Sequence, residues 1–110
     1  MAIIEITKEN FEAETENSIA VIDFWGPKCS PCLALMPKYH ELAENPKYKG
    51  KIKFCSVDTS ANRRVCMMIK PAVMALPTFL FFKDGKETAR FSGNDITIEK
   101  IVAKVDELCA

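Results

Sequence analysis

Residues 18–25 form an apolar segment, in which Ile19-Ala-Val-Ile22 is followed by Asp23 and then by Phe24 and Trp25. A strand that helices cover on both faces of a sheet reads as an almost continuous apolar run, whereas a strand with one face in water alternates with polar residues. We therefore predict a central strand in a sheet that has helices on both faces. With 110 residues the chain has the size of one typical domain, and we expect a single domain over residues 1–110.

Strand and helix patterns alternate along the rest of the chain. Strands are expected at residues 2–6, 18–25, 51–58, 77–82 and 87–91, and helices at residues 8–17, 29–44, 60–69 and 96–108. Thr7 is the expected N-cap of the first helix, Thr59 or Ser60 that of the third, and Asp84-Gly85 predicts a tight hairpin turn. This order predicts an α/β three-layer sandwich, with a mixed sheet of about five strands between about four helices. The sheet is expected to start parallel and to end in an antiparallel C-terminal hairpin.

The helix predicted over residues 29–44 follows the central strand directly. Pro37 lies inside it and is expected to kink it, because proline lacks an amide hydrogen and crowds the preceding turn. The residues expected to face the sheet recur at roughly helical spacing: Leu33, Met36, Tyr39-His40 and Ala43.

Cys29 and Cys32 stand two residues apart where this helix begins, which suits a redox pair, half of a metal site or two small structural residues. In the first turn of a helix both sulfurs come within bonding range, and the free amide groups there favour a thiolate at the first cysteine. Lys28 adds a full positive charge beside it, and Pro31 lies where a missing amide hydrogen costs nothing. We predict Cys29 as an exposed nucleophile of low pKa and Cys32 as a buried resolving thiol.

A metal site would need a second pair of ligands at a compatible spacing. Cys55 and Cys66 are widely spaced and His40 is the only histidine, so we expect no metal and favour the redox pair. Cys55 is expected in the core. Cys66 is expected in the core rather than at the border of the site, and Cys109 is expected to be exposed and open to an intermolecular disulfide.

Asp23 interrupts the apolar run of the central strand. Alternation puts it on the same face as Val21 and Trp25, pointing toward the two cysteines. A buried carboxylate without a partner is costly, so its pKa should be raised and it could take a proton from Cys32. The alternative is an exposed position at the end of the strand.

The charges of the chain balance, with 15 basic and 15 acidic residues, so nothing suggests binding to nucleic acid or to a lipid surface. No apolar run approaches the roughly 20 residues of a membrane-spanning helix. The N-terminal residues lack the basic start and apolar core of a secretory signal, so we expect a cytoplasmic protein. The odd number of cysteines argues for functional or reduced thiols rather than a disulfide scaffold.

Motifs along nearly the whole chain resemble those of the thioredoxin family. They appear in the family's order: Val21-Ile-Asp-Phe-Trp25, Cys29-Ser-Pro-Cys32, Pro37, Val57-Asp58, Leu76-Pro-Thr78, Phe82-Lys-Asp-Gly85 and Gly93. The resemblance implies a thioredoxin-like fold and a thiol–disulfide oxidoreductase, which reduces protein disulfides through a Cys29–Cys32 redox disulfide and binds no cofactor. It also implies electron transport and cell redox homeostasis, a flavin- and NADPH-dependent reductase as electron donor, disulfide-containing proteins as substrates, and a monomer.

The resemblance also assigns roles to single residues. Asp23 matches the family's buried acid, and Trp25 the tryptophan that packs beneath the site. Leu76 precedes Pro77, which matches a proline after a cis peptide bond that faces the disulfide and helps to dock the substrate backbone. Gly93 matches the loop that completes the substrate groove.

Some residues depart from the family pattern. Lys28 replaces a tryptophan, Ser30 replaces a glycine, and Phe54 replaces a lysine near the buried acid, so Asp23 should be desolvated further. The added charge of Lys28 should stabilise the thiolate and make the couple more oxidising. A methionine-rich cluster before Pro77 is interpreted as core rather than as a partner surface, although methionine suits both: Met67, Met68, Val73 and Met74.

Two other functions remain open at this point. A disulfide oxidase or isomerase is favoured by Lys28 and Ser30 and disfavoured by the lack of a signal peptide. A non-catalytic docking module with the same fold is disfavoured by the presence of both cysteines and Asp23.

Overall fold

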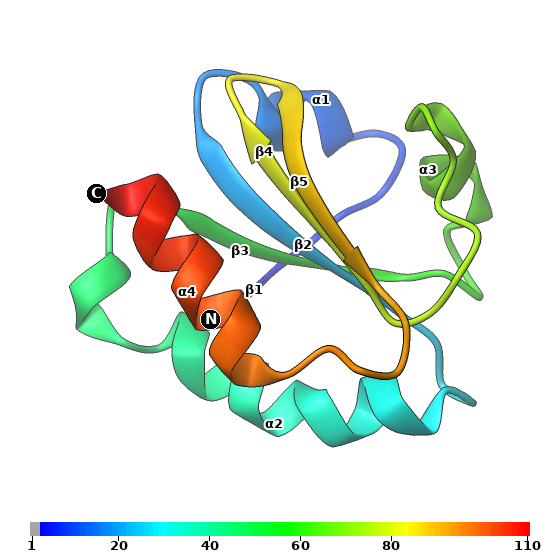
Figure 1. Ribbon diagram of the computed structural model, residues 1–110. Coiled ribbons are helices and arrows are strands. Elements are labelled where there is room, and N and C mark those ends of the chain that lie inside the picture. The colour runs from blue at the N-terminus through cyan, green and yellow to red at the C-terminus, as the bar shows by residue number, and fades with distance from the viewer. Residues whose placement is uncertain (1–2) are drawn as a thin grey trace.

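The computed structural model describes residues 3–110. Its elements follow in the predicted order (Figure 1), with one additional 3-10 turn: β1 (Ile3–Glu5), α1 (Phe11–Thr15), β2 (Ile19–Trp25), α2 (Ser30–Ala43), η1 (Pro46–Tyr48), β3 (Lys53–Asp58), α3 (Arg63–Met68), β4 (Thr78–Lys83), β5 (Lys86–Ser92) and α4 (Ile98–Cys109). The first strand was expected from Ala2, which lies outside the described residues.

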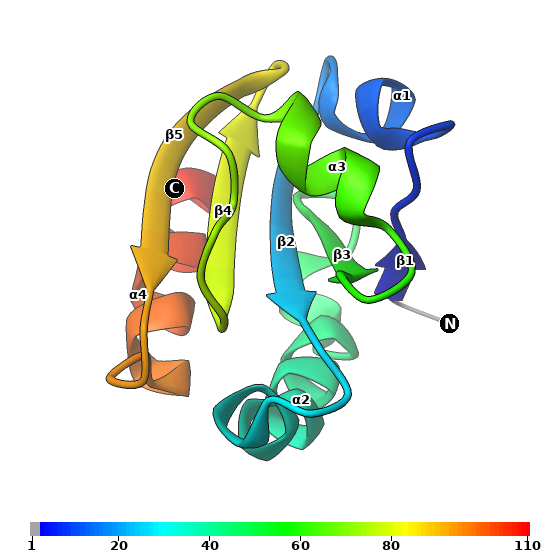
Figure 2. The same cartoon turned by 90° about the vertical axis from the view of Figure 1, so that its right-hand side faces the viewer.

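The sheet has the order β1-β3-β2-β4-β5, so β2 lies at its centre. β1 and β2 pair with β3 in parallel, whereas β4 is antiparallel to both β2 and β5. Helices α2 and α4 cover one face of the sheet, and α1 and α3 cover the other (Figures 1 and 2). The predicted three-layer α/β sandwich with a mixed sheet is confirmed.

Both faces of β2 are buried, as its apolar run predicts. Ala20, Ile22 and Phe24 belong to an apolar cluster with residues of α3, while Val21 belongs to a second cluster with residues of α2 and α4. Burying an aliphatic or aromatic side chain of this size stabilises a fold by roughly 1.5–3 kcal/mol. The central strand is therefore held from two sides, which fixes the position of the residues that follow it.

The face that helix α2 turns toward the sheet agrees only in part with the prediction, because Tyr39 is buried and Ala43 packs against the core as expected, but Leu33 and His40 do not. Its buried residues are Cys32, Tyr39 and Leu42, whereas Leu33 is 44% exposed and His40 is also exposed. The reason is that Cys32 faces the sheet, and the positions seven and ten residues further lie on the same side of a helix. The helix continues through Pro37 to Ala43.

The third helix starts later than predicted, because both expected capping residues bond elsewhere. Thr59 donates its hydroxyl to the Trp25 carbonyl at 2.9 Å, and Ser60 donates its hydroxyl to the Asp58 carboxylate at 2.7 Å. Asn62 therefore occupies the N-cap position of α3.

The first helix also starts later than predicted, at Phe11 rather than after Thr7. The side chain of Asn10 accepts a hydrogen bond from the Thr7 amide at 2.8 Å, and the Thr7 carbonyl accepts from the Phe11 amide at 3.1 Å. These bonds close a turn that leads into α1. The predicted hairpin is confirmed: Asp84 and Gly85 both have positive φ, 51° and 82°, as a two-residue turn between β4 and β5 requires.

Two leucines of α2 test the observed rotation of this helix. We expect Leu42→Ala to lower the free energy of unfolding by about 2–4 kcal/mol, because it leaves a cavity under the helix. Leu33→Ala should cost less than about 1 kcal/mol, because that side chain is exposed. Urea unfolding measures both, and equal losses would contradict the orientation of α2.

Candidate active site

Cys29 and Cys32 lie at the start of α2 and are joined by a disulfide, with their Cα atoms 5.3 Å apart. Cys29 is the N-cap residue, and its Sγ accepts a hydrogen bond from the Cys32 amide at 3.3 Å. Cys29 is half-buried, less open than expected, and Cys32 is buried as predicted. Only the first sulfur can therefore be approached from outside.

Trp25 ends β2 and begins the turn that leads to the cysteines. It is half-buried, and its carbonyl accepts hydrogen bonds from both the amide and the hydroxyl of Thr59, each at 2.9 Å. Gly26 comes next, and a Cβ there would lie only 3.1 Å from Cδ1 of Leu76. The turn after Trp25 and the segment that carries Leu76 thus pack closely. Trp25 and Leu76, both predicted to bind substrate, therefore lie in one region.

The Leu76–Pro77 peptide bond is cis, as the family resemblance implied. Pro77 is buried, and its carbonyl accepts a hydrogen bond from the Gly93 amide at 3.0 Å. Gly93 has a φ of 108°, a conformation that favours glycine. Lys70–Pro71 is a second cis bond, which the sequence did not indicate.

Asp23 is buried in the middle of the sheet, with 1% of its surface exposed, so the alternative of an exposed strand end was wrong. Among the residues that the structure describes, none forms a hydrogen bond with its Oδ1 atom. Burial raises the pKa of this carboxyl from 3.8 to about 7. Asp23 lies two positions after Val21 on β2, so it faces the same side of the sheet as Val21, which α2 covers. Burial and the nearby charge of Asp23 also raise the pKa of Tyr39 on α2.

Phe54 is buried on that same side, where it packs edge to face against Tyr39 with ring centroids 5.9 Å apart. On β3, Phe54 pairs with Val21 of β2. Ser56, two residues further along β3 and on the same face, pairs with Asp23. No opposite charge contributes to the raised pKa of Asp23, which burial alone explains. That Phe54 in particular desolvates Asp23 stays a prediction.

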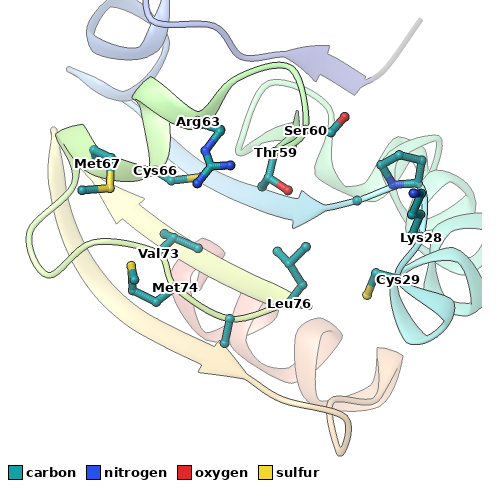
Figure 3. Close-up of a pocket in the computed structure, with 13 residues that line it drawn as sticks. Lys28, Cys29, Thr59, Ser60, Arg63, Cys66, Met67, Val73, Met74 and Leu76 are labelled. Atoms are coloured by element: carbon teal, nitrogen blue, oxygen red, sulfur yellow. The ribbon is translucent and has the colours of Figure 1, made fainter.

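A pocket of about 910 Å³ opens beside Cys29, between α3 and the segment before Pro77 (Figure 3). Of the residues predicted to bind substrate, Leu76 lines it, whereas Trp25, Pro77 and Gly93 do not. The lining residues are Gly26, Pro27, Lys28, Cys29, Thr59, Ser60, Arg63, Cys66, Met67, Val73, Met74, Ala75 and Leu76.

The interpretation of the methionine cluster as core was wrong. Met67 is 55% exposed, Met68 38% and Met74 83%, and only Val73 of this cluster is buried. Arg63 also lines the pocket, and the sequence pattern did not indicate it. The methionines themselves were the available signal, because exposed methionine is frequent at binding surfaces.

Arg90 of β5 anchors the segment that carries Met74 and Leu76. Its guanidinium donates hydrogen bonds to the carbonyls of Pro71 at 2.7 Å and of Ala72 at 3.3 Å. Glu87 accepts two further bonds from the same guanidinium, at 2.8 and 2.9 Å. This wall of the pocket is therefore tied to the sheet.

The three remaining cysteines are not part of a disulfide. Cys55 is fully buried, as predicted, and burial raises the pKa of its thiol to about 12. Cys66 is buried and also lines the pocket, so it combines the two positions considered for it. Cys109 is half-buried against the core, less exposed than expected, and burial raises its pKa.

Within residues 3–110, no group of three or more His, Cys, Asp or Glu side chains could hold a metal ion. In the same part of the chain, no helix has the length and apolar character needed to cross a membrane.

Comparisons with known proteins agree on one family. The family model described as "Thioredoxin" matches residues 2–107. Thioredoxin of Peptoclostridium acidaminophilum is 35% identical over 105 residues, which are 94% of this chain and 92% of that protein. Thioredoxin of Acetoanaerobium sticklandii is 33% identical over 105 residues, 94% and 96% of the two chains. The crystal structure of Malassezia sympodialis thioredoxin (Mala s 13) superimposes with a TM-score of 0.86 at 27% identity, covering 98% of this chain and 91% of the other.

The raised pKa of Asp23 predicts that stability falls as the pH rises. The folded state keeps the proton up to about pH 7, whereas the unfolded state releases it near 3.8, so the folded state binds more protons in between. Unfolding free energy should drop by up to about 4 kcal/mol across this interval, at 1.36 kcal/mol for each pH unit.

Asp23→Asn should remove that pH dependence, and Asp95→Asn, at an exposed carboxylate, should keep it. Urea unfolding of the oxidised proteins at a series of pH values measures the slopes. The same slope in wild type and Asp23→Asn would contradict the assignment.

Proposed function

The chain belongs to the thioredoxin family and is a thiol–disulfide oxidoreductase, and we propose that Cys29 is its attacking thiol and Cys32 its resolving thiol. The observation that carries this assignment is the unequal burial of the pair, with Cys29 half-buried at the N-cap of α2 and Cys32 buried. A disulfide of a protein substrate reaches the more accessible sulfur first.

In the first step the thiolate of Cys29 attacks one sulfur of the substrate disulfide. The substrate S–S bond breaks, a mixed disulfide between Cys29 and the substrate forms, and the second substrate sulfur leaves as a thiolate and takes a proton from water. The Cys32 amide, 3.3 Å from Cys29 Sγ, and the other free amides of the helix end stabilise the negative charge on Cys29. We assign pKa tuning to Lys28, Ser30 and Pro31, which flank it in the chain.

In the second step Cys32 gives its proton to the carboxylate of Asp23 and attacks the sulfur of Cys29. The mixed disulfide breaks, the Cys29–Cys32 disulfide forms, and the remaining substrate sulfur leaves as a thiolate. A carboxyl with a pKa of about 7 suits this exchange near neutral pH. The reaction needs no bound cofactor, because the two sulfurs of the protein supply both electrons.

We assign substrate docking to Trp25, Leu76, Pro77 and Gly93. The close approach of Gly26 to Leu76 and the hydrogen bond between Pro77 and Gly93 support this, because they hold three loops near Cys29. An extended substrate segment could pair its backbone beside Pro77, since that residue directly precedes β4.

Members of this family act on disulfide substrates and are reduced by a thioredoxin reductase. For this chain we propose a flavin-containing, NADPH-dependent enzyme of that kind as electron donor, and a role in electron transport and cell redox homeostasis. A monomeric, cytoplasmic protein of one domain stays a prediction of the sequence.

A disulfide oxidase or isomerase is the second candidate, and the observation in its favour is Lys28. This lysine is exposed, beside Cys29 in the chain, and lines the same pocket. A positive charge there stabilises the reduced, thiolate form and raises the reduction potential of the couple.

Replacing each cysteine by serine tests the two assigned roles. With dithiothreitol as reductant, wild type should accelerate the reduction of insulin, and Cys29→Ser should abolish the acceleration because the attacking sulfur is gone. Cys32→Ser should instead accumulate a covalent adduct with insulin, which mass spectrometry detects. An adduct formed by Cys29→Ser and absent in Cys32→Ser would reverse the roles.

Replacing the lysine tests its effect on the redox couple. Lys28→Trp should lower the reduction potential by on the order of 10–30 mV, because the reduced state loses a stabilising charge, and about 30 mV corresponds to a tenfold change in the equilibrium. Titration in glutathione buffers measures it. Lys38→Trp, at an exposed lysine further along α2, is the control and should leave the potential unchanged. No shift or a rise in Lys28→Trp would reject the tuning role.

A further inference from the structure

The pocket beside Cys29 extends well beyond the disulfide. Figure 3 shows Cys29 and Lys28 at one end, Met67 and Met74 at the other, and Leu76 along the wall between them. This pocket is continuous with the reactive sulfur, so any substrate whose disulfide reaches Cys29 also lies at its mouth. A role of this pocket in substrate binding rests on the proposed function of Cys29.

One end of the pocket is apolar and open to solvent. Met67 and Met74 are 55% and 83% exposed, and Cys66 and Val73 beside them are buried. Large apolar side chains that remain exposed together in a folded chain mark a binding surface. Methionine is flexible and polarizable, so it adapts to apolar side chains of different shapes.

The charges of the pocket are of one sign. Lys28 and Arg63 line it, and no Asp or Glu does. Both side chains are exposed, and within residues 3–110 neither takes part in an ion pair. The carboxylate of Asp58, at the nearby end of β3, does not line the pocket and accepts two hydrogen bonds from Ser60. An acidic group of a substrate would therefore be attracted to this pocket, and a basic one repelled.

Both walls of the pocket are held in place. Thr59 is bonded to the Trp25 carbonyl on one side, and the carbonyls of Pro71 and Ala72 are bonded to Arg90 on the other. The pocket is thus already formed before a substrate arrives, which reduces the entropy lost on binding.

We propose that this pocket binds the polypeptide segment next to the substrate's reactive cysteine. The segment places an apolar side chain among Met67, Met74 and Leu76, and an acidic side chain near Arg63 and Lys28. The protein accordingly selects disulfides in acidic–apolar sequence surroundings.

Four peptide disulfides test the proposal, each with two variable positions within a few residues of the cysteine. These positions hold Leu and Glu, Ser and Glu, Leu and Lys, or Ser and Lys. With dithiothreitol as reductant, we expect wild type to reduce the Leu/Glu peptide with a kcat/KM on the order of 10-fold above that of the Ser/Lys peptide, as a filled apolar pocket discriminates by about 10-fold or more.

Pocket variants should change the ratios of kcat/KM between paired peptides. Met67→Ser combined with Met74→Ser should remove the preference for Leu over Ser, and Arg63→Glu should abolish the preference for Glu over Lys, because the new negative charge offsets the positive charge of Lys28. Met68→Ser and Arg64→Glu are matched controls, because both residues are exposed on α3 but do not line the pocket; they should keep the wild-type ratios.

The outcomes separate this inference from the proposed function. Bis(2-hydroxyethyl) disulfide, which is too small to carry the selected side chains, reports the cysteine chemistry of wild type alone. If wild type reduces it but all four peptides show the same kcat/KM, or if the controls change the ratios as much as the pocket variants do, the inference is overturned and the proposed function stands. If wild type reduces no disulfide, both fail.

Discussion

The burial of β2 between two apolar layers is the interaction on which the rest of the structure depends. Its side chains alternate between a cluster with α3 and a cluster with α2 and α4, so one strand joins both halves of the core. Because apolar side chains pack against both faces of this strand, the turn that follows it leaves the sheet at a fixed point. That turn delivers Cys29 to the N-cap of α2 and Cys32 to its buried side.

The same burial gives Asp23 its chemistry. A carboxyl in the middle of this strand cannot reach water, and burial raises its pKa to about 7. Because the folded state keeps this proton up to about pH 7, the fold loses stability as the pH rises from 3.8 toward 7. Under the proposed mechanism, the group that lowers stability toward neutral pH is the one that accepts a proton from Cys32. Stability and reactivity are thus set by the same side chain.

Local patterns predicted well wherever the deciding forces act between neighbours in sequence. The apolar run of β2, the Asp84-Gly85 turn and the disulfide spacing of Cys29 and Cys32 all belong to this class. The predictions failed where a distant residue decides. Thr59 was expected to cap α3 but donates to the Trp25 carbonyl, 34 residues away in sequence. Leu33 has helical spacing but is exposed, because the inward position of Cys32 sets the rotation of α2. Met67 and Met74 were expected in the core but are exposed, because a sequence pattern does not show whether another segment packs against an apolar side chain.

By itself the sequence determined the order of the elements, the central strand and the redox pair, because hydrophobic periodicity, turn residues and cysteine spacing are local properties of the chain. The motifs between Val21 and Gly93 also determined its family resemblance. Only the tertiary structure decided that Cys29 is half-buried rather than fully exposed, that Thr59 bonds to the Trp25 carbonyl, and that Arg63 and two methionines line a pocket with Cys29. Exposure and electrostatic surroundings depend on which remote segments pack together, and in this chain that packing joins α3 and the segment before Pro77 to the end of β2.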